Sequence, residues 1–146
     1  KLFQNNPECN DVTSTIAFSG VKDIDSTITQ GNYITYNTAT INTNGVLNLD
    51  SGLFTVPQDG RGQYAFSFSC SGKRNKYFQI HVEKNGSLKF YIADGDYQNA
   101  EGANISYYWL EDLQAGDTIR LKVSSSYDDL HSSPSNFIIF NGFRLS

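Results

Sequence analysis

The chain has 146 residues, a formal net charge of −4 at neutral pH and many aromatic residues: nine tyrosines, ten phenylalanines and one tryptophan. This length predicts one domain with a sizeable core. The negative charge argues against nucleic acid as a partner, and no apolar run is long enough to cross a bilayer. Because the sequence begins at Lys1 without Met and shows no signal peptide, we expect a mature or trimmed chain.

Residues 1–14 are polar, contain Pro7 and show no periodicity, so they are interpreted as an N-terminal stub or linker. Neither Gly-x-y repeats nor heptads occur, and no stalk is therefore expected within this chain. Residues 15–146 are predicted to form a globular head. It opens with a strand over Thr15–Val21, a loop over Asp23–Asn32 and two short strands over 33–38 and 46–49.

The stretch from Gly52 to Cys70 carries the strongest pattern in the sequence. An apolar run over Leu53–Val56 ends at Pro57, which has no N–H for a strand ladder. Strict alternation follows, which predicts a strand with one face in the core. The large face consists of Tyr64, Phe66, Phe68 and Cys70, and the small face, which would let another surface approach closely, consists of Ala65, Ser67 and Ser69.

Further strands follow at regular intervals. Asn85-Gly86 is the strongest hairpin signal, because both residues accept the positive φ of a type I′ turn. The strands are expected over Tyr77–Lys84, Leu88–Ile92, Ile105–Leu113, Ile119–Val123 and Phe137–Leu145, with polar loops over Asp94–Asn104 and Ser124–Asn136. Alternation predicts that Glu83 points outward and that the inward residues of these strands include Phe78, Ile80, Leu88, Phe90, Ile92 and Leu121. No segment has a helical period with caps, so about ten short strands predict an all-β sandwich or barrel.

Four spaced motifs resemble the signature of C1q domains, which are similar in fold to tumour necrosis factor. They are, in order, Ile16-Ala-Phe-Ser19; Phe54 and Pro57 with Gly62-x-Tyr64-x-Phe66-x-Phe68; Leu113-x-x-Gly116-Asp117; and Phe140-Asn-Gly142-Phe143-Arg-Leu145. The resemblance covers Thr15–Ser146. It implies a ten-stranded jelly-roll sandwich whose first and last strands are neighbours in the inner sheet, in a secreted protein that forms a homotrimer.

One position departs from the pattern of that family. Two residues before Leu113 the family has an apolar residue, whereas this chain has Glu111. Either a bulge shifts Leu110 into this place, or Glu111 lies at a subunit contact.

The inner sheet of the family packs around a three-fold axis, so the resemblance also implies an interface. The candidates for this trimer contact are Ala65, Ser67 and Ser69 on the small face, and Tyr108 and Leu110, which alternate out of phase with the core side. A solvent-facing sheet in a monomer is the alternative, but tyrosine and leucine are an odd choice for such a face.

Two cysteines and two sequons fit an extracellular protein. Cys9 and Cys70 are consistent with a single disulfide, although the phase of Cys70 also fits a buried free thiol. Asn85 and Asn104 each begin an Asn-x-Ser sequon and would accept glycans in a eukaryotic secretory pathway.

Nothing in the sequence indicates an enzyme. His81 lies on the outward face of a predicted strand and His131 in a loop, and neither forms a local pattern with a Ser or Cys nucleophile. Metalloprotease, phosphate-loop and nucleophile-elbow motifs are absent. Asp94, Asp96 and Glu101 offer the oxygen ligands that calcium uses, but the EF-hand pattern is missing and a solvated acidic loop is the favoured interpretation, so no metal is expected.

Two long polar loops each carry a tyrosine flanked by acids, and a flat apolar ring with polar neighbours suits a sugar. The candidate ligand residues are Asp94, Asp96, Tyr97, Tyr127, Asp128 and Asp129. The alternative is that these tyrosines pack on the edge of the sandwich. The sequence therefore predicts a lectin-like recognition protein of innate immunity that binds glycans or other surface patterns. The alternatives are a cytokine- or adhesion-type ligand of a protein receptor and a structural matrix component.

Overall fold

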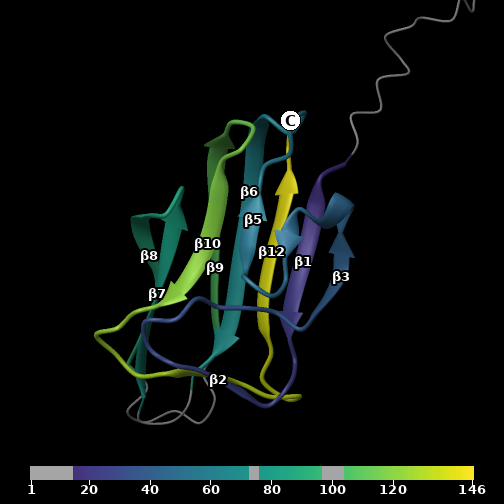
Figure 1. Cartoon of the computed structure of the whole chain (residues 1–146). Helices are drawn as coiled ribbons and strands as arrows, with labels where there is room; N and C mark the ends of the chain where they lie inside the picture. Colours follow the sequence, from purple (N-terminus) through teal and green to yellow (C-terminus); the bar gives the residue numbers. More distant parts are fainter. Residues whose placement is uncertain (1–14, 73–75, 97–103) are drawn as a thin grey trace, which may run out of the picture.

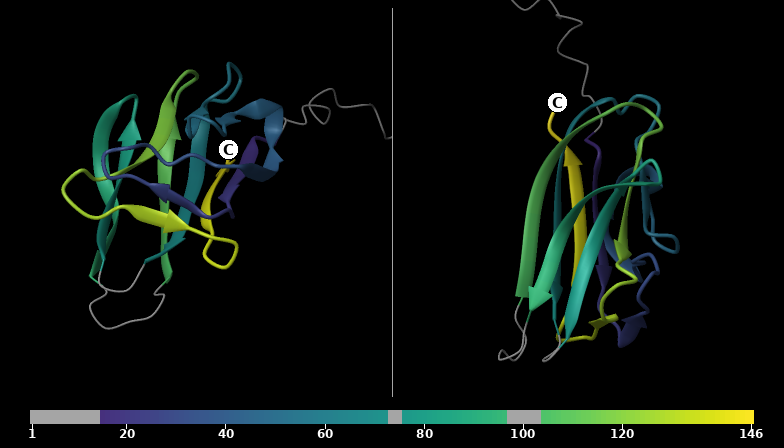
Figure 2. Two further views of the ribbon diagram at one scale, coloured as in Figure 1. Left: turned by 60° about the horizontal axis from the view of Figure 1, so that its bottom comes forward. Right: turned by 90° about the vertical axis from the view of Figure 1, so that its left-hand side faces the viewer.

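The computed structural model describes residues 15–72, 76–96 and 104–146 as a sandwich of two five-stranded antiparallel sheets with a small two-stranded sheet at one end (Figure 1, Figure 2). The strands are β1 (Ala17–Lys22), β2 (Ser26–Ile28), β3 (Thr38–Asn42), β4 (Leu47–Asn48), β5 (Leu53–Thr55), β6 (Gly62–Ser71), β7 (Tyr77–Lys84), β8 (Ser87–Asp96), β9 (Asn104–Leu113), β10 (Thr118–Val123), β11 (Leu130–Ser132) and β12 (Ile138–Arg144), with a 3₁₀ turn at Thr43–Gly45. The predicted stub, residues 1–14, lies outside the described residues, so its boundary stays a prediction.

The first sheet has the order β3-β1-β12-β6-β9. The first and last strands of the chain, β1 and β12, are neighbours in this sheet, with Ala17 opposite Phe143, as the family resemblance implied. This pairing brings the two ends of the described domain to the same end of the sandwich, at the top of Figure 1. The predicted ten-stranded arrangement is therefore confirmed for the two main sheets.

The second sheet has the order β4-β5-β10-β7-β8. Asn85 and Gly86 turn its β7–β8 hairpin with φ angles of 53° and 78°, as the sequence predicted for a type I′ turn. The expected strand over 33–38 is absent from this region. Instead, the segment crosses β10, where the Ile34 N–H donates to the Leu121 carbonyl, and β3 starts only at Thr38.

The core lies between the two main sheets and is rich in aromatic rings. Phe66, at its centre, packs against five other rings with centroid separations of 5.3–6.3 Å, which are Phe18, Phe54, Tyr64, Trp109 and Phe140. The residues expected in the core, Phe66, Phe68, Phe78, Ile80 and Leu121, are completely or almost completely buried, while Phe90 is partly buried at its margin.

One predicted orientation near the β7–β8 hairpin is wrong. Leu88 was expected inward but is 49% exposed, because a register shift at Val82/Glu83 in the β7–β8 ladder places it opposite Glu83 and out of phase with Phe90. A shift of one residue exchanges the faces of the sheet. Glu83 lies on the outward face as predicted, opposite Arg120 of β10, but Tyr33, whose hydroxyl donates to its carboxylate, leaves it only 8% exposed.

Glu111 is buried in the margin of the sandwich. It follows the inward phase of Trp109 and Leu113 on β9, and its ladder with β6 has no bulge, so Leu110 is not shifted inward. Its side chain is 6% exposed and lies 2.6 Å from the Lys89 ammonium on β8. An ion pair thus replaces the apolar contact that the family pattern has here.

Candidate functional site

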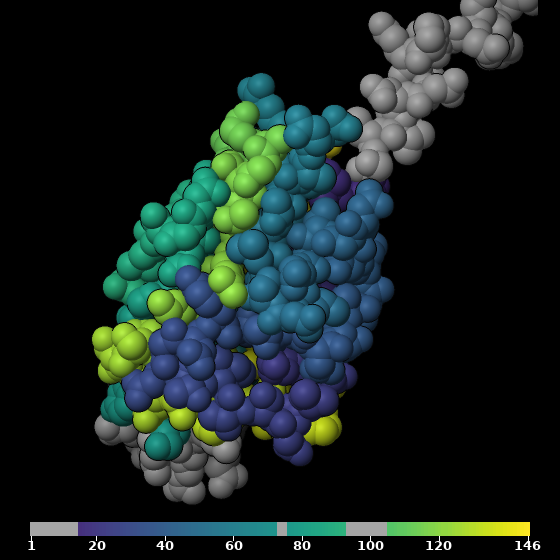
Figure 3. All heavy atoms as spheres, viewed as in Figure 1, coloured from purple at the N-terminus to yellow at the C-terminus, as the bar shows by residue number. Residues whose placement is uncertain are grey.

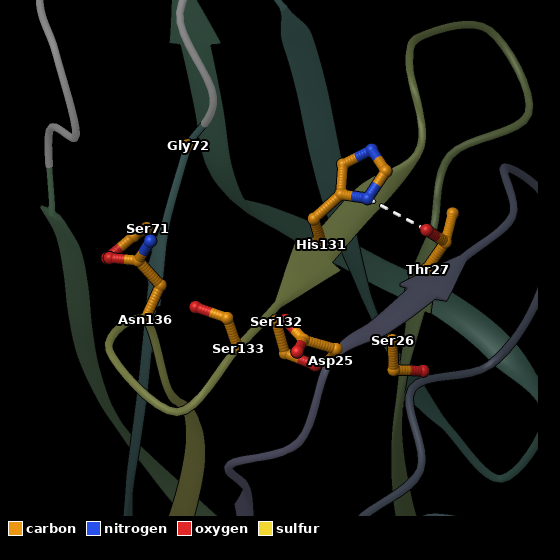
Figure 4. A pocket seen from close by; sticks show the side chains of 9 residues that line it. All are labelled: Asp25, Ser26, Thr27, Ser71, Gly72, His131, Ser132, Ser133 and Asn136. Atoms are coloured by element: carbon orange, nitrogen blue, oxygen red, sulfur yellow. Dashed lines mark hydrogen bonds between the residues drawn. The ribbon is translucent and has the colours of Figure 1, made fainter.

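A polar pocket of about 390 Å³ lies at the end of the sandwich opposite to the chain's C-terminus (Figure 1, Figure 4). It is lined by Asp25, Ser26, Thr27, Ser71, Gly72, His131, Ser132, Ser133 and Asn136. Hydroxyl groups dominate this lining, together with one carboxylate, one imidazole and one amide. Such groups donate and accept hydrogen bonds but offer no large apolar wall.

The small sheet β2–β11 positions the pocket. Ile28 and Leu130 are buried and opposite each other, and they anchor the two strands to the core. Alternation then turns the next pair, Thr27 and His131, toward the pocket. The Thr27 hydroxyl lies 2.8 Å from His131 Nδ1 (Figure 4), which fixes the orientation of the imidazole. In Figure 3 the indigo and yellow-green atoms of the two segments lie against each other at this end.

The candidate acids of the second loop, Asp128 and Asp129, have structural partners. Asp128 accepts a hydrogen bond of 2.9 Å from the Tyr77 N–H and lies 3.6 Å from the Lys76 ammonium. Asp129 accepts one of 2.8 Å from the Gln30 N–H. These bonds attach the loop to β7 and to the segment after β2. The same acids, with Gln30, Lys76 and His131, line a smaller pocket of about 100 Å³, while Tyr127 is 36% exposed at the surface.

The first candidate loop is shorter than predicted. β8 continues through Asp94 and Asp96, which pair with Gln79 and Tyr77 of β7. Because Tyr77 also bonds to Asp128, the backbones of both predicted ligand segments reach the same end of the sandwich. Tyr97 and Glu101 lie outside the described residues, as do the side chains of Asp94, Asp96 and Asn104.

Metal and disulfide predictions stay open. Among the described residues, no group of three or more His, Cys, Asp or Glu side chains is placed to hold a metal ion, and the calcium candidates Asp94, Asp96 and Glu101 are not among the side chains described. Cys70 is buried and forms no disulfide with any described residue, and burial raises the pKa of its thiol to about 12. Its predicted partner, Cys9, lies outside the described residues.

The glycan acceptor Asn85 has a second role in the structure. Its amide donates to Asp117 Oδ1 at 3.0 Å and accepts from the Thr118 N–H at 2.9 Å. The hairpin is thereby connected to the turn before β10. Its glycosylation stays a prediction.

The open face of the first sheet carries the residues predicted for trimer contact. Three ladder rows cross it: Ala17–Phe143–Ala65–Leu110, Ser19–Asn141–Ser67–Tyr108 and Val21–Ile139–Ser69–Ser106. These rows contain no charged residue, and Leu110, Tyr108 and Phe143 are 63%, 61% and 41% exposed. Ala65 is fully buried between its row neighbours, so Leu110 and Phe143 form the surface there.

Sequence reasoning missed the residues that line the polar pocket beside β2 and β11, above all Thr27 and Asn136. Both lie in segments that were interpreted as loops. The two strands here have three residues each, which is too short for alternation to stand out. An apolar residue beside a polar one, as in Thr27-Ile28 and Leu130-His131, was the one sequence pattern that could have indicated these two strands.

The comparisons with known proteins agree with this geometry. A family model for the C1q domain matches residues 17–145. The chain is similar to the globular domain of zebrafish complement 1qA, with 18% identity and a TM-score of 0.72, over 91% of this chain and 98% of that one. It is also similar to murine APRIL, with 13% identity and a TM-score of 0.63, over 88% of this chain and 99% of that one. A third similar structure is Eiger TNF from S. frugiperda, with 10% identity and a TM-score of 0.59, over 90% of this chain and 93% of that one. No curated protein matches it in sequence. In the described residues, no helix has the length and apolar character needed to cross a membrane.

Proposed function

Because the chain belongs to the C1q domain family, we propose that it is an extracellular recognition head that forms a trimer and binds glycans at its pocketed end. The family is non-catalytic, which confirms the prediction that this chain is not an enzyme. Heads of this family typically form trimers, and its proteins are typically secreted. The partner and the site in this chain are the proposal.

The observation that carries the proposal is the polar pocket beside the small β2–β11 sheet and the end of β6. Its hydroxyl, carboxylate, imidazole and amide groups match the donors and acceptors of a sugar. The exposed ring of Tyr127 lies on the segment that leads into β11 and supplies the apolar surface that a sugar ring needs. A single site of this kind is weak, because each hydrogen bond exchanged with water contributes only about 1 kcal/mol.

Trimer formation compensates for weak single sites. The three uncharged rows on the open face of the first sheet, with Tyr108 and Leu110, support assembly of three copies around them. Three equivalent pockets on one rigid head raise the apparent affinity for a clustered ligand about 10²–10⁴-fold without any new contact.

A glycan array probed with the wild-type chain and with Thr27→Val and Asn136→Ala tests the site. We expect both variants to lose the glycans that the wild type binds while keeping its size by light scattering. Gln114→Ala is the matched control, because Gln114 lines a different pocket, of about 460 Å³, beside Ser146. Equal binding by wild type and both pocket variants would place the site elsewhere, and an empty array with capture of a protein receptor would favour a cytokine-type ligand.

A further inference from the structure

The outward face of the second sheet carries basic and aromatic side chains that the pocket does not use. Lys122 on β10 pairs in register with His81 on β7, which pairs with Tyr91 on β8. On the other side of Lys122, Tyr33 forms an isolated bridge to it from the segment that crosses the sheet. These four residues, Tyr33, Lys122, His81 and Tyr91, are called the cationic–aromatic row below.

Positive charge exceeds negative charge around this row. The Arg120 guanidinium lies 3.4 Å from the centre of the Tyr33 ring and the Lys122 ammonium 5.4 Å from it. The acid nearby, Glu83, is 8% exposed and accepts a hydrogen bond of 2.8 Å from the Tyr33 hydroxyl. In the part of the chain that the structure describes, no carboxylate forms an ion pair with Lys122. Among the side chains that the structure describes, two half-buried cations lie beside one covered carboxylate, which leaves a net positive charge at this surface of a protein of formal charge −4.

An exposed ring completes the row. Tyr91 is 52% exposed, and its ring meets the His81 ring edge to face at 4.7 Å. Partial burial and the neighbouring Lys122 lower the pKa of His81, against the opposing effect of Glu83. The lowered pKa favours the neutral imidazole, which packs against the Tyr91 ring and lies between Tyr91 and Lys122 in the row.

We propose that the cationic–aromatic row binds a linear anionic polysaccharide. A carboxylate or sulfate group would lie against Lys122 and a sugar ring against Tyr91. Because neighbouring strands are about 4.8 Å apart, four residues in register extend over roughly 14 Å, which suits an extended chain rather than a small anion. A trimer built on the first sheet leaves this face open, because the two sheets lie on opposite sides of the core. The row is separate from the pocket and does not depend on the function proposed for it.

Dextran sulfate and unmodified dextran test the proposal, because they share a backbone and differ in charge. Polygalacturonate is the third probe and separates carboxylate from sulfate recognition. We expect binding of one or both anionic polymers, no binding of dextran, and affinity that falls as salt rises. Lys122→Ala should weaken binding about tenfold or more, as for the loss of a hydrogen bond to a charged group, and Tyr91→Ala should weaken it severalfold.

Arg61→Ala is the matched control, because it removes one exposed positive charge near the chain's C-terminal end. If Arg61→Ala weakens binding as much as Lys122→Ala, the polymer is attracted by the overall positive charge of the surface and not by the cationic–aromatic row, and the proposal fails. It also fails if dextran binds as well as dextran sulfate, or if polyglutamate competes equally, which would indicate an acidic protein as the partner. Binding of an anion beside Lys122 should also raise the pKa of His81 in an NMR titration, whereas a purely structural role of Lys122 would leave it unchanged.

Discussion

Truncation of Phe66 to alanine measures how much the aromatic cluster stabilises the sandwich. Phe66 is completely buried and has five aromatic neighbours within 6.3 Å. Large-to-alanine substitutions of buried aromatics cost about 3–5 kcal/mol, and aromatic pairs add about 0.5–1.5 kcal/mol each beyond the burial of their area. We therefore expect a loss in the upper half of that range, about 4–5 kcal/mol.

Urea unfolding with linear extrapolation measures this loss as a shift in midpoint at constant slope. Leu88→Ala is the matched control, since simple alternation places Leu88 in the core whereas the structure leaves it 49% exposed. We expect it to cost within about 0.5 kcal/mol, as for other surface substitutions. A loss below about 1 kcal/mol for Phe66→Ala, or above about 2 kcal/mol for Leu88→Ala, would refute the assignment of faces.

Three further predictions concern buried or hydrogen-bonded polar groups. Lys89→Ala leaves the Glu111 carboxylate buried without its partner, and we expect a cost at the lower end of roughly 3–5 kcal/mol because Lys89 itself is partly exposed; a double variant with leucine at both positions should recover most of it in the same urea assay. Hydrogen bonds from the Gln114 N–H and the Asn85 amide lower the pKa of Asp117, so its stabilising effect is present above the ordinary aspartate pKa and is lost as pH falls through the lowered value. The melting temperatures of wild type and Asp117→Ala should accordingly approach each other as the pH falls below about 3.8, and a constant difference down to pH of about 2 would contradict this linkage. Cys70 should resist thiol reagents in the native protein, because it is buried and its pKa is raised to about 12. In the denatured, unreduced protein, labelling of both cysteines would exclude the Cys9–Cys70 bond. Labelling of neither would support it within one chain, unless the protein runs as a dimer only without reductant, which would place the bond between chains.

Most of the fold could be predicted from the sequence, because its long strands alternate clearly. The large face of β6, from Tyr64 to Cys70, lies in the core as expected, and the Asn85-Gly86 turn has the predicted positive φ angles. Errors arose where alternation is interrupted. The register shifts between β7 and β8 depend on how the two strands meet in three dimensions, which no pattern along a single strand reveals.

The candidate site was less predictable, because it is assembled from segments distant in the sequence. Thr27 and His131 are 104 residues apart and meet only through the β2–β11 pairing. Asp128 and Asp129 were predicted to bind a ligand because carboxylates suit sugar hydroxyls, yet each accepts a hydrogen bond from a backbone N–H. Composition marked these loops as polar, but only the fold separates the acids that attach a loop from the groups that line a pocket.

The central claim is that the chain forms a trimeric head whose weak sites act together. It is tested most directly by comparing the affinity for a single glycan with the affinity for clustered glycan, in the wild type and in one variant. The apparent affinity for a glycan found on the array is measured in monovalent form and clustered on a surface, for wild type and for Leu110→Asp. Leu110 is 63% exposed in one of the three uncharged rows, so an aspartate there should prevent assembly with little effect on the fold. We expect the clustered form to bind wild type about 10²–10⁴-fold more tightly than the monovalent form, and the monomeric variant to lose this gain while retaining monovalent binding. An equal gain in a variant shown by light scattering to be monomeric would contradict the account.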